Sequence, residues 1–148
     1  MKYLLDTNIC VLYLNGRSLS VWQRLRATDV QDIVVCSVVK AELFYGAWKS
    51  NNPEKSLAKQ QRFLAVFESL PFDDKSAETA GKIRAQLAAM GTPIGSYDLQ
   101  IAAIALTNNL TLVTHNTPKF SRVSDLKLED WEAQSICYRH LQFMQEIF

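Results

Sequence analysis

The chain has 148 residues, of which 48% are apolar and 21% are charged, and its formal net charge is +1. This composition is typical of one water-soluble domain large enough to bury a core, and no apolar stretch is long enough to span a bilayer, which argues against a membrane role. Residues 1–62 hold nine basic and five acidic side chains, a modest bias that solvated helix faces explain more simply than a polyanionic partner does.

The first part of the chain alternates between strand and helix patterns. The apolar run at residues 3–5 predicts a buried strand. Apolar side chains at helical spacing then predict two helices, which end at Leu14 and Arg26. The β-branched run at residues 33–36 predicts a second buried strand.

A pair of helices is expected next. Residues 38–50 and 53–70 each carry an apolar stripe, and a short polar break separates them. Pro53 suits the first turn of the second helix, and Pro71 ends it. The sequence therefore predicts a protruding helical hairpin with exposed apolar surface.

The last part of the predicted domain holds two more helices and two strands. We expect helices at residues 77–90 and 97–107, a strand at 110–114 and a short edge strand at 126–128. The regular alternation favours a three-layer α/β/α sandwich with a mainly parallel central sheet. Hydroxyl side chains that suit the N-terminal caps of three of these helices are Thr7, Ser37 and Ser76.

Two features of the sequence concern the cellular compartment. The N-terminus leads directly into the first strand, without the basic and apolar regions of a signal peptide, so we expect a cytoplasmic protein. The three cysteines, Cys10, Cys36 and Cys137, form no CxxC pair. They indicate buried free thiols rather than disulfides or zinc ligands.

Three acidic residues occupy corresponding places in the predicted sheet. Asp6 ends the first strand, Glu42 lies early in the helix after the second, and Asp98 lies in the first turn of the helix before the third, while Asn116 follows that third strand. The carboxyl ends of parallel strands meet at one edge, so we expect these side chains to converge. Hard oxygen ligands without cysteine or paired histidine suit Mg²⁺, with Mn²⁺ able to substitute. Such a site supports attack of a metal-activated water on a phosphodiester.

Each of these residues taken singly also has a structural explanation. Asp6 is equally suited to capping a helix, and Glu42 to a solvated helix face or an ion pair with a nearby lysine. Asp98 near a helix start is favoured by the helix dipole. His115 is better explained as a surface or structural residue than as a general base. Only the common placement at one sheet edge favours a joint role.

The same segments resemble the motifs of PIN-domain ribonucleases, and more closely those of the VapC-type toxins of bacterial toxin–antitoxin pairs. The resembling motifs are Asp6-Thr7-Asn8, the Ser-Val-Val-Lys-Ala-Glu run at residues 37–42, Gly95-Ser96-Tyr97-Asp98 leading into Ile101-Ala102-Ala103, and Leu112-Val113-Thr114-His115-Asn116 with Phe120. The resemblance covers about residues 1–131 and implies a PIN-like nuclease domain there. Residues 132–148 then form an apolar C-terminal tail of unknown role.

This resemblance implies a Mg²⁺-dependent endoribonuclease, usually dimeric, that a cognate antitoxin silences by laying a segment across the active-site groove. The implied metal-binding acids are Asp6, Glu42 and Asp98, and the implied site-shaping residues are Thr7, Asn8 and Thr114. Asn116 stands at the fourth acidic position of many family members, and a neutral amide is a weaker ligand, so the number of metal ions stays open. The hairpin at residues 38–70 is the implied antitoxin surface.

Two other functions stay under consideration. A catalytically inactive PIN-like binding or scaffold module is motivated by the neutral side chain of Asn116. A phosphatase or phosphotransfer domain fits poorly, because the common aspartyl-phosphate phosphatases need a second acid two residues after the first, where this chain has Asn8.

Overall fold

The computed structural model describes residues 1–132, which form a five-stranded sheet with helices on both faces. The strands are β1 (Tyr3–Leu5), β2 (Ile33–Cys36), β3 (Glu68–Leu70), β4 (Thr111–Val113) and β5 (Lys127–Glu129). They lie in the order β3-β2-β1-β4-β5, and every neighbouring pair is parallel. The predicted three-layer α/β/α sandwich is confirmed. Cys137 and all but the first residue of the predicted tail, 132–148, lie outside the described residues.

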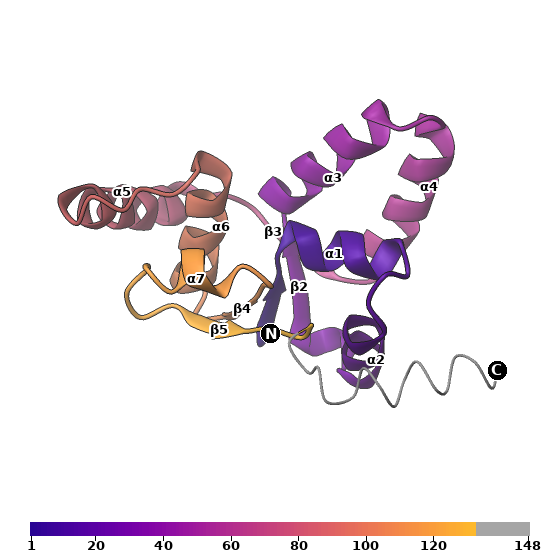
Figure 1. Cartoon of the computed structure of the whole chain (residues 1–148), viewed down its shortest axis with the longest axis horizontal. Coiled ribbons are helices and arrows are strands. Elements are labelled where there is room, and N and C mark those ends of the chain that lie inside the picture. The colour runs from indigo at the N-terminus through magenta and orange to yellow at the C-terminus, as the bar shows by residue number, and fades with distance from the viewer. Residues whose placement is uncertain (133–148) are drawn as a thin grey trace.

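Helices occupy both faces of the sheet. They are α1 (Thr7–Leu14), α2 (Leu19–Ala27), α3 (Ser37–Lys49), α4 (Pro53–Leu64), α5 (Asp74–Ala89), α6 (Ser96–Thr107) and the short α7 (Thr117–Phe120), with a 3-10 turn at Val30–Asp32. Crossovers between parallel strands are almost always right-handed, so a reversal in strand order moves the helices to the opposite face. Figure 1 shows α1 to α4 on one side of the strands and α5 to α7 on the other. None of the helices within residues 1–132 is long and apolar enough to cross a membrane.

The core lies between the sheet and these two helical layers. All four residues of β2 are buried, as are Leu4 and Leu5 of β1. On the opposite side, residues 101–105 of α6 are fully buried, and three of them are alanines, which let the helix backbone pack closely. Each fully buried leucine or isoleucine contributes about 1.5–3 kcal/mol of transfer free energy. The core therefore holds the carboxyl ends of the central strands in fixed positions.

The prediction of one helix over residues 53–70 is wrong in its last third. Helix α4 ends at Leu64, and residues 68–70 pair with β2 as the edge strand β3. The backbone N–H of Phe67 donates to the carbonyl of Leu64 and closes the last turn. The end of α4 and the turn after it both place apolar side chains in the same core, as Leu64 and Phe67 show. In the sequence these side chains are therefore spaced as they would be on one continuous helix. A three-residue strand is also too short to show alternation.

Three helices begin one or more residues earlier than their predicted caps. Asp6 caps α1 by accepting from the backbone N–H of Thr7, and Asp73 caps α5 by accepting from that of Ser76. Cys36 is the cap of α3, so Ser37 lies inside the helix. In α1 and α5 an aspartate preceding the hydroxyl residue is the acceptor, because its carboxylate also interacts favourably with the helix dipole. Asp6 thus has both a structural contact and a place at the sheet edge.

Candidate active site

The candidate site lies where the strand order reverses. From central β1 the chain passes to β2 and β3 on one side, and later to β4 and β5 on the other. In open parallel sheets a crevice forms at such a switch point, beyond the carboxyl ends of the two strands. Asp6 directly follows β1, and Thr114 directly follows β4. The topology therefore brings these two residues together.

The carboxylate of Asp6 is held at both oxygens. One oxygen, Oδ1, accepts from the backbone N–H of Thr7 at 2.8 Å, and Oδ2 accepts from the hydroxyl of Thr114 at 2.8 Å. Burial is the largest influence on Asp6 and raises its pKa, whereas the two hydrogen bonds oppose that rise. The negative charges of Asp98 and Glu42 raise the pKa of Asp6 further. The three acids therefore share one electrostatic neighbourhood.

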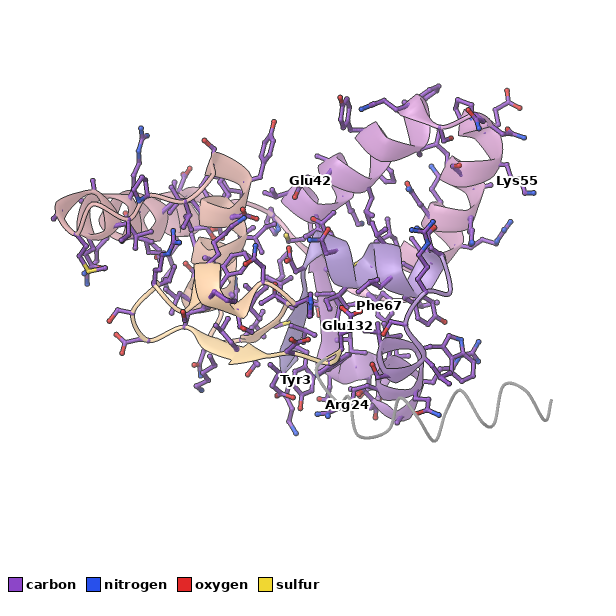
Figure 2. The ribbon with its side chains drawn as sticks, viewed as in Figure 1. Tyr3, Arg24, Glu42, Lys55, Phe67 and Glu132 are labelled. Carbon is purple, nitrogen blue, oxygen red and sulfur yellow. The ribbon has the colours of Figure 1, made fainter. Side chains whose placement is uncertain are left out.

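Glu42 is joined to Asp6 through Thr7. The hydroxyl of Thr7 donates to Oε1 of Glu42 at 2.8 Å, while its backbone N–H donates to Asp6. Glu42 lies in the second turn of α3. Figure 2 shows it near the start of that helix, at the end of the hairpin that is distant from Lys55 on α4. Thr7 thus stands between two of the predicted metal-binding acids.

Asp98 reaches the site from the other face of the sheet. It is the third residue of α6, and its side chain is 25% exposed. Its Oδ2 accepts a hydrogen bond of 2.8 Å from Nζ of Lys119 in α7. Lys119 is not predictable from the sequence, because a lone lysine between two predicted strands carries no signal beyond its place three residues after Asn116.

The segment after β4 completes the surroundings of the site. The backbone N–H of Asn116 donates to the hydroxyl of Thr114 at 3.0 Å, so Thr114 links Asp6 to Asn116. His115 is exposed, and its Nδ1 lies 3.0 Å from Oδ2 of Asp130, away from this network. The placement of His115 agrees with its prediction as a surface residue. Asn8 is exposed in the first turn of α1.

The donor chemistry fits a hard divalent cation. Within residues 1–132 no three acidic, histidine or cysteine side chains are grouped closely enough to hold a metal ion as they stand. The carboxylates of Asp6, Glu42 and Asp98 nevertheless face one edge of the sheet and supply only oxygen donors, which suit Mg²⁺ or Mn²⁺. The carboxylates would have to move closer together for all three to bind one ion.

The nearby cysteines do not change this donor set. Cys10 and Cys36 are both buried and unpaired, as predicted. Burial raises the pKa of Cys36 to about 11, and it raises that of Cys10 further. Neither residue supplies a thiolate near neutral pH, so the site remains an oxygen site.

Two grooves lie on the hairpin side of the sheet, and the first of them adjoins the site. One has a volume of about 330 Å³, lies between α1 and the α3–α4 hairpin, and includes Thr7 and Glu42 in its lining. The second, of about 500 Å³, is lined by aromatic and aliphatic side chains of α1, α2 and α4 and by three basic residues, Arg26, Lys59 and Arg62. The grooves share two lining residues, Leu14 and Lys59, and are therefore neighbours on the surface.

Comparison with known proteins gives consistent matches over the described part of the chain. The model of the PIN domain family matches residues 3–126. The tRNA(fMet)-specific endonuclease VapC of Shigella flexneri is 40% identical over 131 residues, which cover 88% of this chain and 98% of that protein. Ribonuclease VapC2 of Rickettsia felis is 39% identical, covering 89% of this chain and 99% of that protein.

Solved structures show the same similarity. The crystal structure of DNA-bound VapBC from Salmonella typhimurium contains a chain that matches with a TM-score of 0.84 and 37% identity, covering 88% of this chain and 98% of that one. VapBC2 from Rickettsia felis, bound to a DNA fragment from its promoter, matches with a TM-score of 0.81 and 40% identity, covering 88% of this chain and 99% of that one. The overall fold is therefore shared with these chains.

Proposed function

This chain belongs to the PIN-domain family and is of the VapC type, and on that premise we propose that it is a Mg²⁺-dependent endoribonuclease, the toxin of a toxin–antitoxin pair. One observation carries the proposal. A continuous series of hydrogen bonds crosses the switch point, and Asp98 lies close enough to raise the pKa of Asp6. The residues of this series are Glu42, Thr7, Asp6 and Thr114.

The arrangement suits phosphodiester hydrolysis. A Mg²⁺ ion held by the three acids would lower the pKa of an attacking water and stabilise the charge that develops on the scissile phosphate. Thr7 and Thr114 fix both oxygens of Asp6, so that this carboxylate needs no reorganisation before it binds a cation. The mutual repulsion of Asp6, Glu42 and Asp98 favours cation binding, because a divalent ion relieves it.

The proposed substrate is RNA, which the names of the VapC relatives support. Attack by water leaves a 5′-phosphate and a 3′-hydroxyl, since the ribose 2′-hydroxyl takes no part. The test is cleavage of a mixed RNA pool by the purified protein with Mg²⁺, with Mn²⁺ and with excess chelator. Metal-dependent cleavage with 5′-phosphate ends is expected, and a 2′,3′-cyclic phosphate product would contradict the mechanism.

We propose that the partner is a cognate antitoxin whose apolar, partly acidic segment fills the groove of α1, α2 and α4. The similar VapBC structures support such a partner. The groove offers exposed Trp22 and Val66 beside buried Phe67, and basic side chains lie at the same surface. A segment seated there can continue past Lys59 toward Glu42 and so block the site. The expected antitoxin surface thus extends from the hairpin onto α2.

Two further parts of the proposal follow the family resemblance. We propose that the toxin is a homodimer and that it acts in the cytoplasm, where its RNA substrate is found. Light scattering of the purified toxin, alone and with its antitoxin, tests the oligomeric state, and a monomeric mass at micromolar concentration would contradict the dimer.

A catalytically inactive binding module is the second candidate. It is favoured by the neutral Asn116 and by the lack, within residues 1–132, of a ready-made three-ligand cluster. The same cleavage assay separates the two candidates. Absence of cleavage from a folded, antitoxin-free protein that also binds no divalent cation in calorimetry would support the binding module.

A further inference from the structure

Lys119 is the cationic side chain that the structure places at the acids of the site. Lys119 forms a salt bridge with Asp98, one of the three site carboxylates. The other salt bridges among residues 1–132 involve none of these three acids. The Nζ of Lys119 is 2.8 Å from Oδ2 of Asp98, and the two side chains are 34% and 25% exposed. The contact is partly shielded from solvent, which reduces the screening of its charges by water and salt.

The position of Lys119 is set by its neighbours. It lies in the single turn of α7, where Pro118 restricts the first turn and Phe120, only 1% exposed, inserts into the core. The turn starts at Asn116, whose backbone N–H is bonded to Thr114. The lysine is thus carried by an anchored turn and not by a mobile loop tip, which lowers the entropic cost of holding its ammonium group at Asp98.

The charges of the site give Lys119 a specific role. Three ionised carboxylates exceed the charge of one divalent cation by one unit, and the ammonium of Lys119 supplies that unit. Many family members have a fourth acid at the position of Asn116, and its extra negative charge would favour a second cation. Asn116 is neutral and adds no such charge. The donors and Lys119 together therefore balance a single divalent ion.

We propose that Lys119 is a built-in counter-ion that takes the place of a second metal ion: its ammonium group, held at Asp98, neutralises the excess negative charge, so that the three carboxylates take one divalent cation and not two. This inference rests on the proposed metal-dependent function and deepens it. Lys119 is a positioning residue, because it acts through Asp98. It also repels any second cation from the same edge of the sheet.

Replacement of the lysine tests the role by metal binding, without reference to RNA cleavage. Calorimetric titration of the purified, antitoxin-free protein with MnCl₂ and with MgCl₂ is expected to give one ion per protomer. In Lys119→Gln the repulsion between the ammonium and the ion is gone, so the first ion binds more tightly, on the order of tenfold, and a second ion binds at higher concentration. Lys119→Arg keeps the charge and is expected to behave like the unchanged protein.

Thermal unfolding supplies the second readout. Without metal, Lys119→Gln leaves three carboxylates uncompensated and is expected to unfold at a lower temperature, whereas saturating Mg²⁺ restores the unfolding temperature. Lys127→Gln is the matched control, because Lys127 is an exposed lysine of β5 in register with Thr111, at the opposite end of the sheet. This control is expected to change neither metal binding nor the response to Mg²⁺. Lys119→Met, which keeps the aliphatic stem, repeats both measurements if the glutamine variant folds poorly.

The possible results separate this inference from the function on which it rests. Unchanged affinity and stoichiometry in Lys119→Gln, or a loss of unfolding temperature that Mg²⁺ does not restore, would reduce the lysine to a structural ion pair and overturn the inference alone. A protein that binds no divalent cation with or without Lys119 would overturn the metal-dependent function as well. Two ions bound per protomer in the unchanged protein would also overturn the inference, while leaving that function in place.

Discussion

Thr114 donates a hydrogen bond of 2.8 Å to Asp6 across the switch point of the sheet, although 108 positions separate the two residues in the sequence. Both side chains are buried, with Asp6 only 4% exposed. The orientation of the central carboxylate therefore depends on the pairing of β1 with β4. Any change that disturbs that pairing is therefore expected to change the orientation of Asp6 and to slow the proposed cleavage.

Replacement of Asp6 by asparagine should abolish cleavage without unfolding the protein. The amide is a weak metal ligand, and we expect the cleavage rate to fall at least about 100-fold. The amide has nearly the same shape and places no charge in a buried position, so the unfolding temperature should stay the same or rise. The matched control is Asp125→Asn, because Asp125 is exposed and has a φ of 67°, which asparagine also adopts readily. Full cleavage by the folded Asp6→Asn variant would contradict the assignment.

Replacement of Thr114 by valine should lower both stability and activity. Valine keeps the branched shape but leaves Oδ2 of Asp6 and the N–H of Asn116 without their hydroxyl partner. We expect a loss of about 1–3 kcal/mol in the free energy of unfolding, measured with denaturant, and slower cleavage. Thr111→Val, at the other end of β4, should change neither by a comparable amount. Equal effects of the two substitutions would mean that the Asp6 contact has no special role.

The raised pKa of Asp6 predicts a specific dependence of stability on pH. Burial raises this pKa above 3.8, so folding favours the protonated carboxyl. The contribution of Asp6 to stability is fully present below pH 3.8 and is lost as the pH rises through the raised folded pKa. In chelator, Asp6→Asn should therefore gain stability over the unchanged protein as the pH rises through that window toward neutrality. Thermal unfolding of both proteins between pH 4 and 8 measures this, and parallel curves would contradict it.

The groove of α1, α2 and α4 gives a prediction for antitoxin binding. Trp22 is 40% exposed in that groove, so Trp22→Ala should weaken the toxin–antitoxin complex by about 10- to 100-fold while sparing RNA cleavage. Trp48 on α3 is 66% exposed and lines neither groove, which makes Trp48→Ala the matched control. Affinities are measured by calorimetry with the purified antitoxin. A larger effect of Trp48→Ala would indicate that the antitoxin binds the outer face of the hairpin.

The parts of the fold that the sequence predicted are those with continuous apolar runs. β1, β2 and β4 are covered on both faces, so each is an uninterrupted apolar run in the sequence. The position of Asp6 follows from the rule that sites lie at the carboxyl ends of parallel strands, and that of Asp98 from its place in the first turn of a helix. β3 was missed because its pairing with β2 depends on tertiary contact and not on its own three residues. The proximity of the three acids was therefore predictable, whereas their role as metal ligands stays a prediction.

The contacts between those acids were less predictable. Two of these contacts join residues of different helices. Thr7 of α1 donates to Glu42 of α3, and Lys119 of α7 donates to Asp98 of α6. Such contacts depend on helix orientation and side-chain rotamers, which sequence periodicity does not specify. The sequence predicted that the acids converge, but it did not predict that a threonine lies between two of the carboxylates and a lysine beside the third.

The central position of β1 has a consequence for the synthesis of the protein. Its two neighbours in the sheet are supplied by residues 33–36 and by residues 111–113, so one edge of β1 stays unpaired until most of the chain has been translated. Thr114 and Lys119 leave the ribosome later still, and a domain folds as a unit once its long-range pairings are available. A nascent or truncated chain that ends before β4 therefore has the three acids but lacks the hydroxyl of Thr114 and the ammonium of Lys119 that contact two of them. The ribosome that makes this nuclease is exposed to its assembled site only after residues 111–119 have been translated.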